Sequence, residues 1–222
     1  LKGAGDHSGR ILLTFGAITA FISMWISNTA TTAMMLPIGL GIIATMEKVF
    51  SQRLGTPPGT GPTRFGTGMM LMTAYAASAG GIGTPVGTPP NIIGIAMIEK
   101  YVHVKIPFFQ WMAFAVPLLV VMYAALFFLL YLLHRPEVAD LKGSSTFIRE
   151  HRQQLGRWSR GEKNSLTACS VTVALWITPG ILAVLFTADS AIYKNFNAIF
   201  PESVAALLGA VLLFILPTNW KK

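Results

Sequence analysis

Charged side chains are scarce in this sequence of 222 residues, at 12% of the total, whereas a typical soluble domain carries about 25%. Hydrophobic residues make up 53%, and the mean hydropathy is +0.57. These values exclude an ordinary soluble domain. The single cysteine, Cys169, excludes an intrachain disulfide, and its apolar neighbours predict a small packed residue.

Charged side chains of either sign are missing from the interior of every long apolar run. All nine acidic residues lie in connectors or at run ends, and so do the four histidines. This pattern excludes a buried proton relay, a set of zinc ligands and a nucleophile paired with a base. We therefore predict that the protein is not an enzyme.

The sequence does contain long runs of apolar residues. Runs of about 20 apolar residues match the hydrocarbon thickness of a bilayer. Long runs occur at 11–46, 65–98, 107–133 and 166–187, and a shorter one at 204–216. They predict an all-α polytopic protein in the lipid bilayer, multi-pass in the plasma membrane, which is the inner membrane if the organism is bacterial.

Basic residues are distributed unevenly between the connections. Fourteen of the seventeen Lys and Arg residues fall in 1–10, 48–64, 134–165 and 218–222. Short loops rich in Lys and Arg face the cytoplasm, so these four segments are predicted there. The net charge of +8 then follows from membrane topology, and nucleic acid is not expected as a partner.

The first apolar run has basic segments on both sides, so both of its ends are expected on the cytoplasmic side. A helical hairpin satisfies this, with Ile11–Ile26 entering and Ala30–Met46 returning. Each arm of about 16 residues would reach roughly 24 Å, slightly short of a full crossing of about 30 Å. A re-entrant hairpin and two short spans both remain open.

The second run should cross once, but its middle, "SAGGIGTPVGTPPN" at 78–91, holds three Pro and four Gly. These residues cannot continue a helix. The span is therefore predicted as two pieces, 65–77 and 92–100, around an irregular loop. Irregular backbone at membrane depth is tolerated where it is buried in protein or lines a wet cavity.

The later runs are expected as plain spans. Pro117 is predicted to kink the span at 107–133, and 166–187 and 204–216 are expected to go out and back. The basic connector 134–165 fits either an interfacial amphipathic helix or a solvated loop, and the sequence leaves both open.

Polar residues mark both interruptions as helix ends. In "SMWISNTATTAMMLP", Ser27 and Asn28 stand where the hairpin turns, and Thr88 precedes Pro89 as a cap precedes the first helical residue. Helix N-termini attract carboxylate or sulfate, and unpaired carbonyls with hydroxyls suit a small cation. Since no Lys or Arg is nearby, a bound dianion needs cations beside it, which favours coupling to Na⁺.

A purely structural role for these side chains is the alternative. Ser and Thr in membrane helices bond back to their own helix or join helices together, and this role is preferred for Thr31 and Thr32. Two separate polar breaks in one membrane protein favour a binding function for the other polar residues at these breaks.

Two motifs, "MWISNTATTAMMLPI" and "GGIGTPVGTPPNII", resemble the hairpin and broken helix of the divalent anion:sodium symporter family, the di- and tricarboxylate transporters. The resemblance extends in element order over essentially the whole chain. It implies a substrate site formed by Ser27, Asn28, Thr29, Thr88 and Pro89, in which Asn28 and Thr29 touch a substrate carboxylate.

The same resemblance implies a first sodium site at Ser23, Ser27, Asn28 and the backbone of Gly87. It implies an inverted-repeat, elevator-type fold in which a transport domain moves against a dimeric scaffold. The transport part is expected at 1–106, with a hairpin at 11–47 and a broken helix at 65–100. The part at 107–222 is expected to be mainly scaffold, with spans 107–133, 166–187 and 204–216 and the connector 134–165.

One departure from the family pattern is the lack of a second Ser-Asn-Thr element in this sequence. We therefore expect a fragment that carries half of the substrate clamp and does not transport alone. The expected function is Na⁺-coupled import of C4-dicarboxylates such as succinate, malate or fumarate, by a homodimer of the full-length protein. The alternatives are citrate or sulfate as cargo, or a membrane scaffold that does not transport.

Overall fold

The computed structural model describes residues 7–54, 63–136, 158–186 and 190–216, with the side chains of 48–54 left aside. Two compact units emerge: one comprises 1–105 and 112–155, the other 106–111 and 156–222. The predicted domain boundary at 106/107 falls next to this division, but most of the helix that follows groups with the first unit.

The predicted hairpin is present in the first unit. Helix α1 spans Ser8–Ser23 and helix α2 spans Asn28–Leu54. The arms are unequal, since α1 has 16 residues while α2 has 27. Within α2, Asn28–Glu47 is long and apolar enough to cross a membrane, whereas α1 is a shorter apolar helix.

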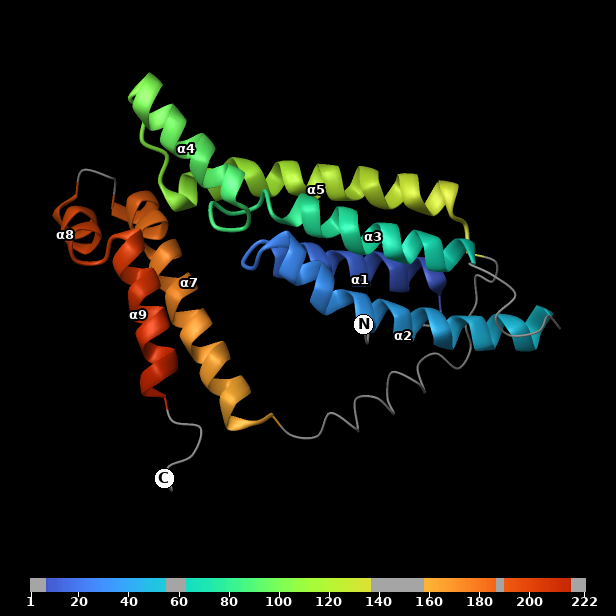
Figure 1. Cartoon of the computed structure of the whole chain (residues 1–222). Helices are drawn as coiled ribbons and strands as arrows, with labels where there is room; N and C mark the ends of the chain where they lie inside the picture. The colour runs from blue at the N-terminus through green and yellow to red at the C-terminus, as the bar shows by residue number, and fades with distance from the viewer. Residues whose placement is uncertain (1–6, 55–62, 137–157, 187–189, 217–222) are drawn as a thin grey trace. The chain divides into compact units, whose positions relative to one another are not determined.

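The predicted broken span is also present, as helix α3 at Arg64–Gly80 and helix α4 at Pro89–Val102. The break is shorter than the sequence indicated, because α3 continues three residues beyond Ala77 and α4 begins at the prolines. Helices α1, α2 and α3 pack side by side, as Figure 1 shows. Helix α4 buries Asn91 and leaves most of its apolar side chains exposed.

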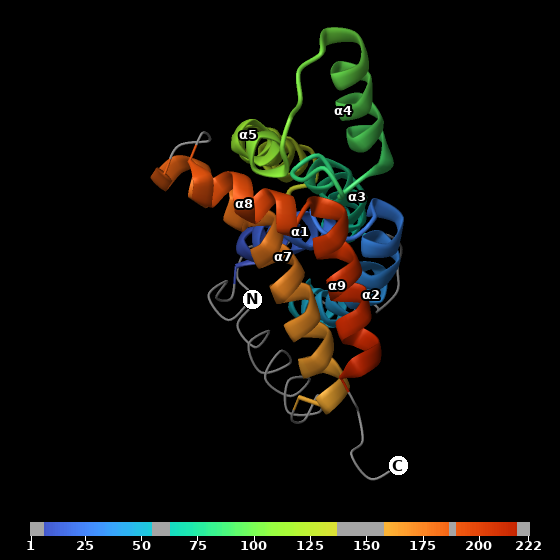
Figure 2. The ribbon, with the colours of Figure 1, turned by 90° about the vertical axis from the view of Figure 1, so that its left-hand side faces the viewer.

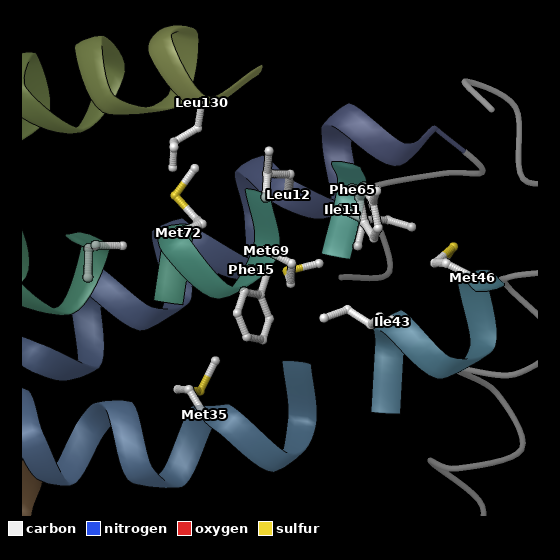
Figure 3. Packing of buried hydrophobic residues seen from close by; sticks show 12 residues of the cluster. Ile11, Leu12, Phe15, Met35, Ile43, Met46, Phe65, Met69, Met72 and Leu130 are labelled. Carbon is white, nitrogen blue, oxygen red and sulfur yellow. The ribbon is translucent and has the colours of Figure 1, made fainter. Parts of the chain in front are cut away.

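The core of this unit lies where α1, α2 and α3 meet (Figure 3). Ile11, Phe15 and Met72 are almost completely buried there, and Ile11 and Phe15 share one face of α1 because they stand four residues apart. Lipid tails are as apolar as these side chains, so the hydrophobic effect contributes little to helix association in a membrane. Close van der Waals packing stabilises such contacts instead. The following buried residues complete the cluster: Leu12, Ala20, Met35, Ile43, Met46, Phe65, Met69, Ala76 and Leu130.

Helix α5, Phe108–Leu133, is long and apolar enough to span a membrane. Pro117 lies inside this helix, which continues through it. Farther along, Leu130 joins the core of the first unit, and the Tyr123 hydroxyl donates to the carbonyl of Leu13 in α1. These contacts explain why Met112–Leu133 groups with α1–α3.

The second unit contains helices α7, Arg160–Phe186, α8, Ala191–Ile199, and α9, Glu202–Ile215. Asn164 Nδ2 donates to the carbonyl of Leu216 at 3.2 Å, and Trp176 Nε1 donates to the carbonyl of Glu202 at 3.0 Å. The start of α7 thus meets the end of α9, and the two helices are antiparallel.

The expected segment 204–216 is helix α9, which has 14 residues. The short helix α8, which the sequence did not indicate, bends against it by 50° (Figure 2). Together the two helices are long and apolar enough for one broken span or a re-entrant loop. The expectation of a packed side chain at Cys169 was wrong. Cys169 is exposed, because the buried face of α7 passes through its neighbour Ala168.

The connector is described only in part. Residues 137–157, where an amphipathic helix was one of the two alternatives, lie outside the described residues. The end of the predicted connector, from Arg160 onward, is already the start of α7.

Candidate functional site

The turn between α1 and α2 begins the site. Ser27 precedes α2 and caps it: its hydroxyl accepts from the N–H of Ala30 at 3.4 Å, and its carbonyl accepts from the N–H of Thr31 at 2.9 Å. A helix end and a helix start therefore meet at this turn, as the polar cluster predicted.

The loop between α3 and α4 forms the other half. Thr88 occupies the cap position of α4 with extended backbone, φ −150° and ψ 143°, and Pro89 follows as the first helical residue. The Thr88 side chain makes no capping hydrogen bond to the described backbone. Its half-buried hydroxyl therefore stands at a helix N-terminus, where backbone N–H groups carry partial positive charge.

Ser23 joins the hairpin to α3. It is fully buried, and its hydroxyl lies 2.7 Å from the carbonyl oxygen of Ala77 and 2.9 Å from Oδ1 of Asn28. A hydroxyl has one hydrogen, and the orientation of an amide is an assignment. With the Asn28 amide turned over, Nδ2 donates to Ser23, the Ser23 hydrogen goes to Ala77, and the Asn28 oxygen is left to accept elsewhere.

Asn28 also touches the loop. A Cβ atom added at Gly81 would clash with Oδ1 of Asn28 and come within 2.9 Å of its Cγ and Nδ2 atoms. A Cβ at Gly87 would lie 2.5 Å from the carbonyl oxygen of Gly81 and 3.0 Å from that of Met24. Gly81 and Gly87 thus let the loop backbone approach the hairpin turn closely.

Two further residues, which the sequence analysis did not single out, hold the loop. Thr84 is fully buried; its hydroxyl donates to the carbonyl of Met24 and accepts from the N–H of Gly87 at 3.1 Å. Asn91 Nδ2 donates to the carbonyls of Gly81 and Thr84, at 2.8 Å each. Both stand inside the second motif, but their partners are set by the tertiary contact.

The structure therefore brings together only part of the predicted set. Ser23, Asn28 and Gly87 gather where the turn meets the loop, through the contacts given above. Thr29 and Pro89 are exposed. Thr31, for which a structural role was preferred, is buried and reaches the carbonyl of Ile26 at 3.5 Å.

Comparison with known proteins identifies the family of this chain. The model of the sodium:sulfate symporter transmembrane region matches residues 2–222. The chain belongs to this family. The resemblance drawn from the two motifs is thus confirmed, as is an all-helical membrane fold.

Two relatives of this symporter-family chain are named sodium-dependent dicarboxylate transporter SdcS. The protein from Staphylococcus saprophyticus is 31% identical over 219 residues, which cover 98% of this chain and 40% of the relative. One from Staphylococcus aureus is 32% identical over 216 residues, 97% of this chain and 39% of the relative. The chain therefore spans about two fifths of the length of these curated relatives.

Proposed function

We propose that the full-length protein is a sodium-coupled secondary transporter, not an enzyme, that imports small divalent anions. C4-dicarboxylates such as succinate, malate or fumarate are its expected substrates, in line with the names of the relatives. The observation that carries the proposal is the contact of Asn28 with both helix breaks, through Ser23 and Gly81.

The sodium site in this proposal is formed by Ser23, Ser27, Asn28 and the backbone of Gly87. Hydroxyl, amide and carbonyl oxygens are the ligands that hard cations take. Turning the Asn28 amide over frees its oxygen for Na⁺ while the Ser23 hydroxyl stays paired with Ala77. The contact between Gly87 and the carbonyls of Gly81 and Met24 supports a cluster of oxygen atoms at this point.

The substrate site uses Ser27, Asn28, Thr29, Thr88 and Pro89. Thr29 is exposed in the first turn of α2, and Thr88 holds a hydroxyl without a capping bond at the start of α4. Two helix N-termini, each equivalent to roughly half a positive charge, would then face one substrate carboxylate. With no Lys or Arg in either motif, the second negative charge requires bound Na⁺.

The same proposal assigns parts to the elevator motion. Helices α1–α4, within 1–106, form part of the transport domain, and α7 and α9 belong to the scaffold of a homodimer. The packing of Leu130 and Tyr123 favours α5 moving with α1–α3, although 107–133 was expected to be mainly scaffold. The proposed setting is the plasma membrane, which agrees with the membrane-length helices Asn28–Glu47, Phe108–Leu133 and Arg160–Phe186.

Sulfate is the second candidate substrate, because the family description names it, and citrate follows from the expected tricarboxylate transporters. The test is succinate uptake into proteoliposomes carrying the full-length protein, with and without an inward Na⁺ gradient, and with sulfate or citrate as competitor. Uptake that needs Na⁺ supports the proposal. Equal uptake without Na⁺ contradicts the sodium site, and no uptake of any of the three anions favours a scaffold that does not transport.

A further inference from the structure

Thr84 is the buried polar residue that spans the junction of loop and turn. Its side chain is completely buried, and its hydroxyl makes two hydrogen bonds of opposite sense. The hydrogen goes to the carbonyl of Met24, which is 60 residues away in the sequence. The oxygen accepts the N–H of Gly87 at 3.1 Å. One hydroxyl therefore bridges the end of α1 and the loop.

Two other buried threonines in the same unit, Thr19 and Thr73, bond only within their own helices. Thr19 donates to the carbonyl of Phe15, and Thr73 donates to that of Met69, each at 2.8 Å and four residues back in its own helix. Such bonds add little beyond the helix itself. Thr84 differs because both of its partners lie outside helices and one belongs to another segment.

The carbonyl of Thr84 is held as firmly as its side chain. Asn91 Nδ2 donates to it and to the carbonyl of Gly81, and Asn91 is only 7% exposed. The loop is thus tied to α4 by Asn91, and to the hairpin by the hydrogen bond from Thr84 to the Met24 carbonyl. The Thr84 hydroxyl also orients the N–H of Gly87.

We propose that Thr84 is a positioning residue that holds the Gly87 backbone against the hairpin turn and thereby sets the affinity of the cation site. The proposal rests on the sodium-coupled function given above. Thr84 itself does not touch the cation; it holds the N–H of Gly87, the residue whose carbonyl oxygen is the proposed ligand. Losing its hydroxyl removes the donor to the Met24 carbonyl. The Gly87 N–H loses its shorter hydrogen bond and keeps the one to the Thr84 carbonyl at 3.3 Å. Without the bond to Met24, the loop relaxes away from Ser23 and Asn28.

The test is a graded series at this position in the full-length protein. Thr84→Val keeps the side-chain shape and removes the hydroxyl, Thr84→Ser keeps the hydroxyl, and Thr84→Cys offers only a weak donor and acceptor. The controls Thr19→Val and Thr73→Val remove a buried hydroxyl that bonds within its own helix. The readouts are the half-saturating Na⁺ concentration for succinate uptake, and the Na⁺-dependent rise in Tm of purified protein.

We expect Thr84→Val to raise the half-saturating Na⁺ concentration about ten-fold, Thr84→Cys to raise it less, and Thr84→Ser and the two controls to stay within about two-fold. If valine only loosened the packing, Tm would fall in all three valine variants, and their half-saturating Na⁺ concentrations would be alike. Wild-type Na⁺ affinity in Thr84→Val overturns the inference, and if that variant fails to fold, wild-type affinity in Thr84→Cys does the same. Na⁺-independent uptake by the wild type would instead refute the proposed function.

Discussion

Gly81→Ala tests the contact between the loop and the hairpin most directly. Gly81 caps α3 with φ −57° and ψ −20°, a conformation that alanine adopts without strain. Its effect is therefore steric: the new Cβ would collide with the Asn28 amide, whose Cγ lies 2.9 Å away from it. Since carbon atoms pack at about 3.5–4.0 Å, the amide must retreat by roughly 1 Å.

The size of the effect depends on how easily the Asn28 side chain moves away from the new Cβ atom. Asn28 is half-buried and its amide is the end of a flexible side chain, so the stability cost belongs near the lower end of the usual 1–3 kcal/mol for overpacking (about 1 kcal/mol). Binding should suffer more, because a hydrogen bond or similar contact to a charged partner contributes about 1.5–3 kcal/mol. That range corresponds to a rise of about ten- to a hundred-fold in the half-saturating Na⁺ concentration.

The assay is Na⁺-dependent succinate uptake by the full-length protein, with thermal unfolding measured in parallel. Gly41→Ala and Gly94→Ala are matched controls, since a Cβ at either position meets no atom within 4 Å and alanine is favoured in helices. If Gly81→Ala transports with wild-type Na⁺ affinity while remaining folded, the placement of Asn28 in the cation site is refuted.

Substitutions at three further positions test other parts of the structure. Asn28→Ala should weaken Na⁺ and succinate binding together, because one amide serves both sites, and wild-type uptake in this variant would contradict that role. Gly87→Val should impair Na⁺ affinity, since its Cβ would meet the Gly81 carbonyl oxygen at 2.5 Å; unchanged affinity would count against the site. In the second unit, the exposed Glu202 accepts through Oε1 from the N–H of Phe108, the first residue of α5, at 2.9 Å. An exposed carboxylate at a helix N-terminus contributes about 0.3–1 kcal/mol, so Glu202→Ala should lower the free energy of unfolding by that amount. Glu202→Gln should cost less, because it keeps a hydrogen-bond acceptor for the Phe108 N–H.

Much of the fold followed from local chemistry that a sequence displays directly. The two helix breaks were predicted at Ser27–Asn28 and Thr88–Pro89, because capping residues and proline act on backbone groups within one turn. The membrane character likewise follows from apolar length and the uneven placement of Lys and Arg. Errors arose where such signals are weak, as at the short helix α8.

The arrangement of the site needed the tertiary structure. Ser23 finds Ala77 at a separation of 54 residues and Thr84 finds Met24 at 60, and no local preference selects such partners. Gly81 lacks a side chain because the Asn28 amide fills that space, a reason that becomes visible only when the two segments pack. Cys169 is exposed while Ala168 is buried, since an apolar stretch leaves open which helix face will meet a neighbour. The sequence determined where its helices break and what polar groups stand there; packing decided which of those groups meet.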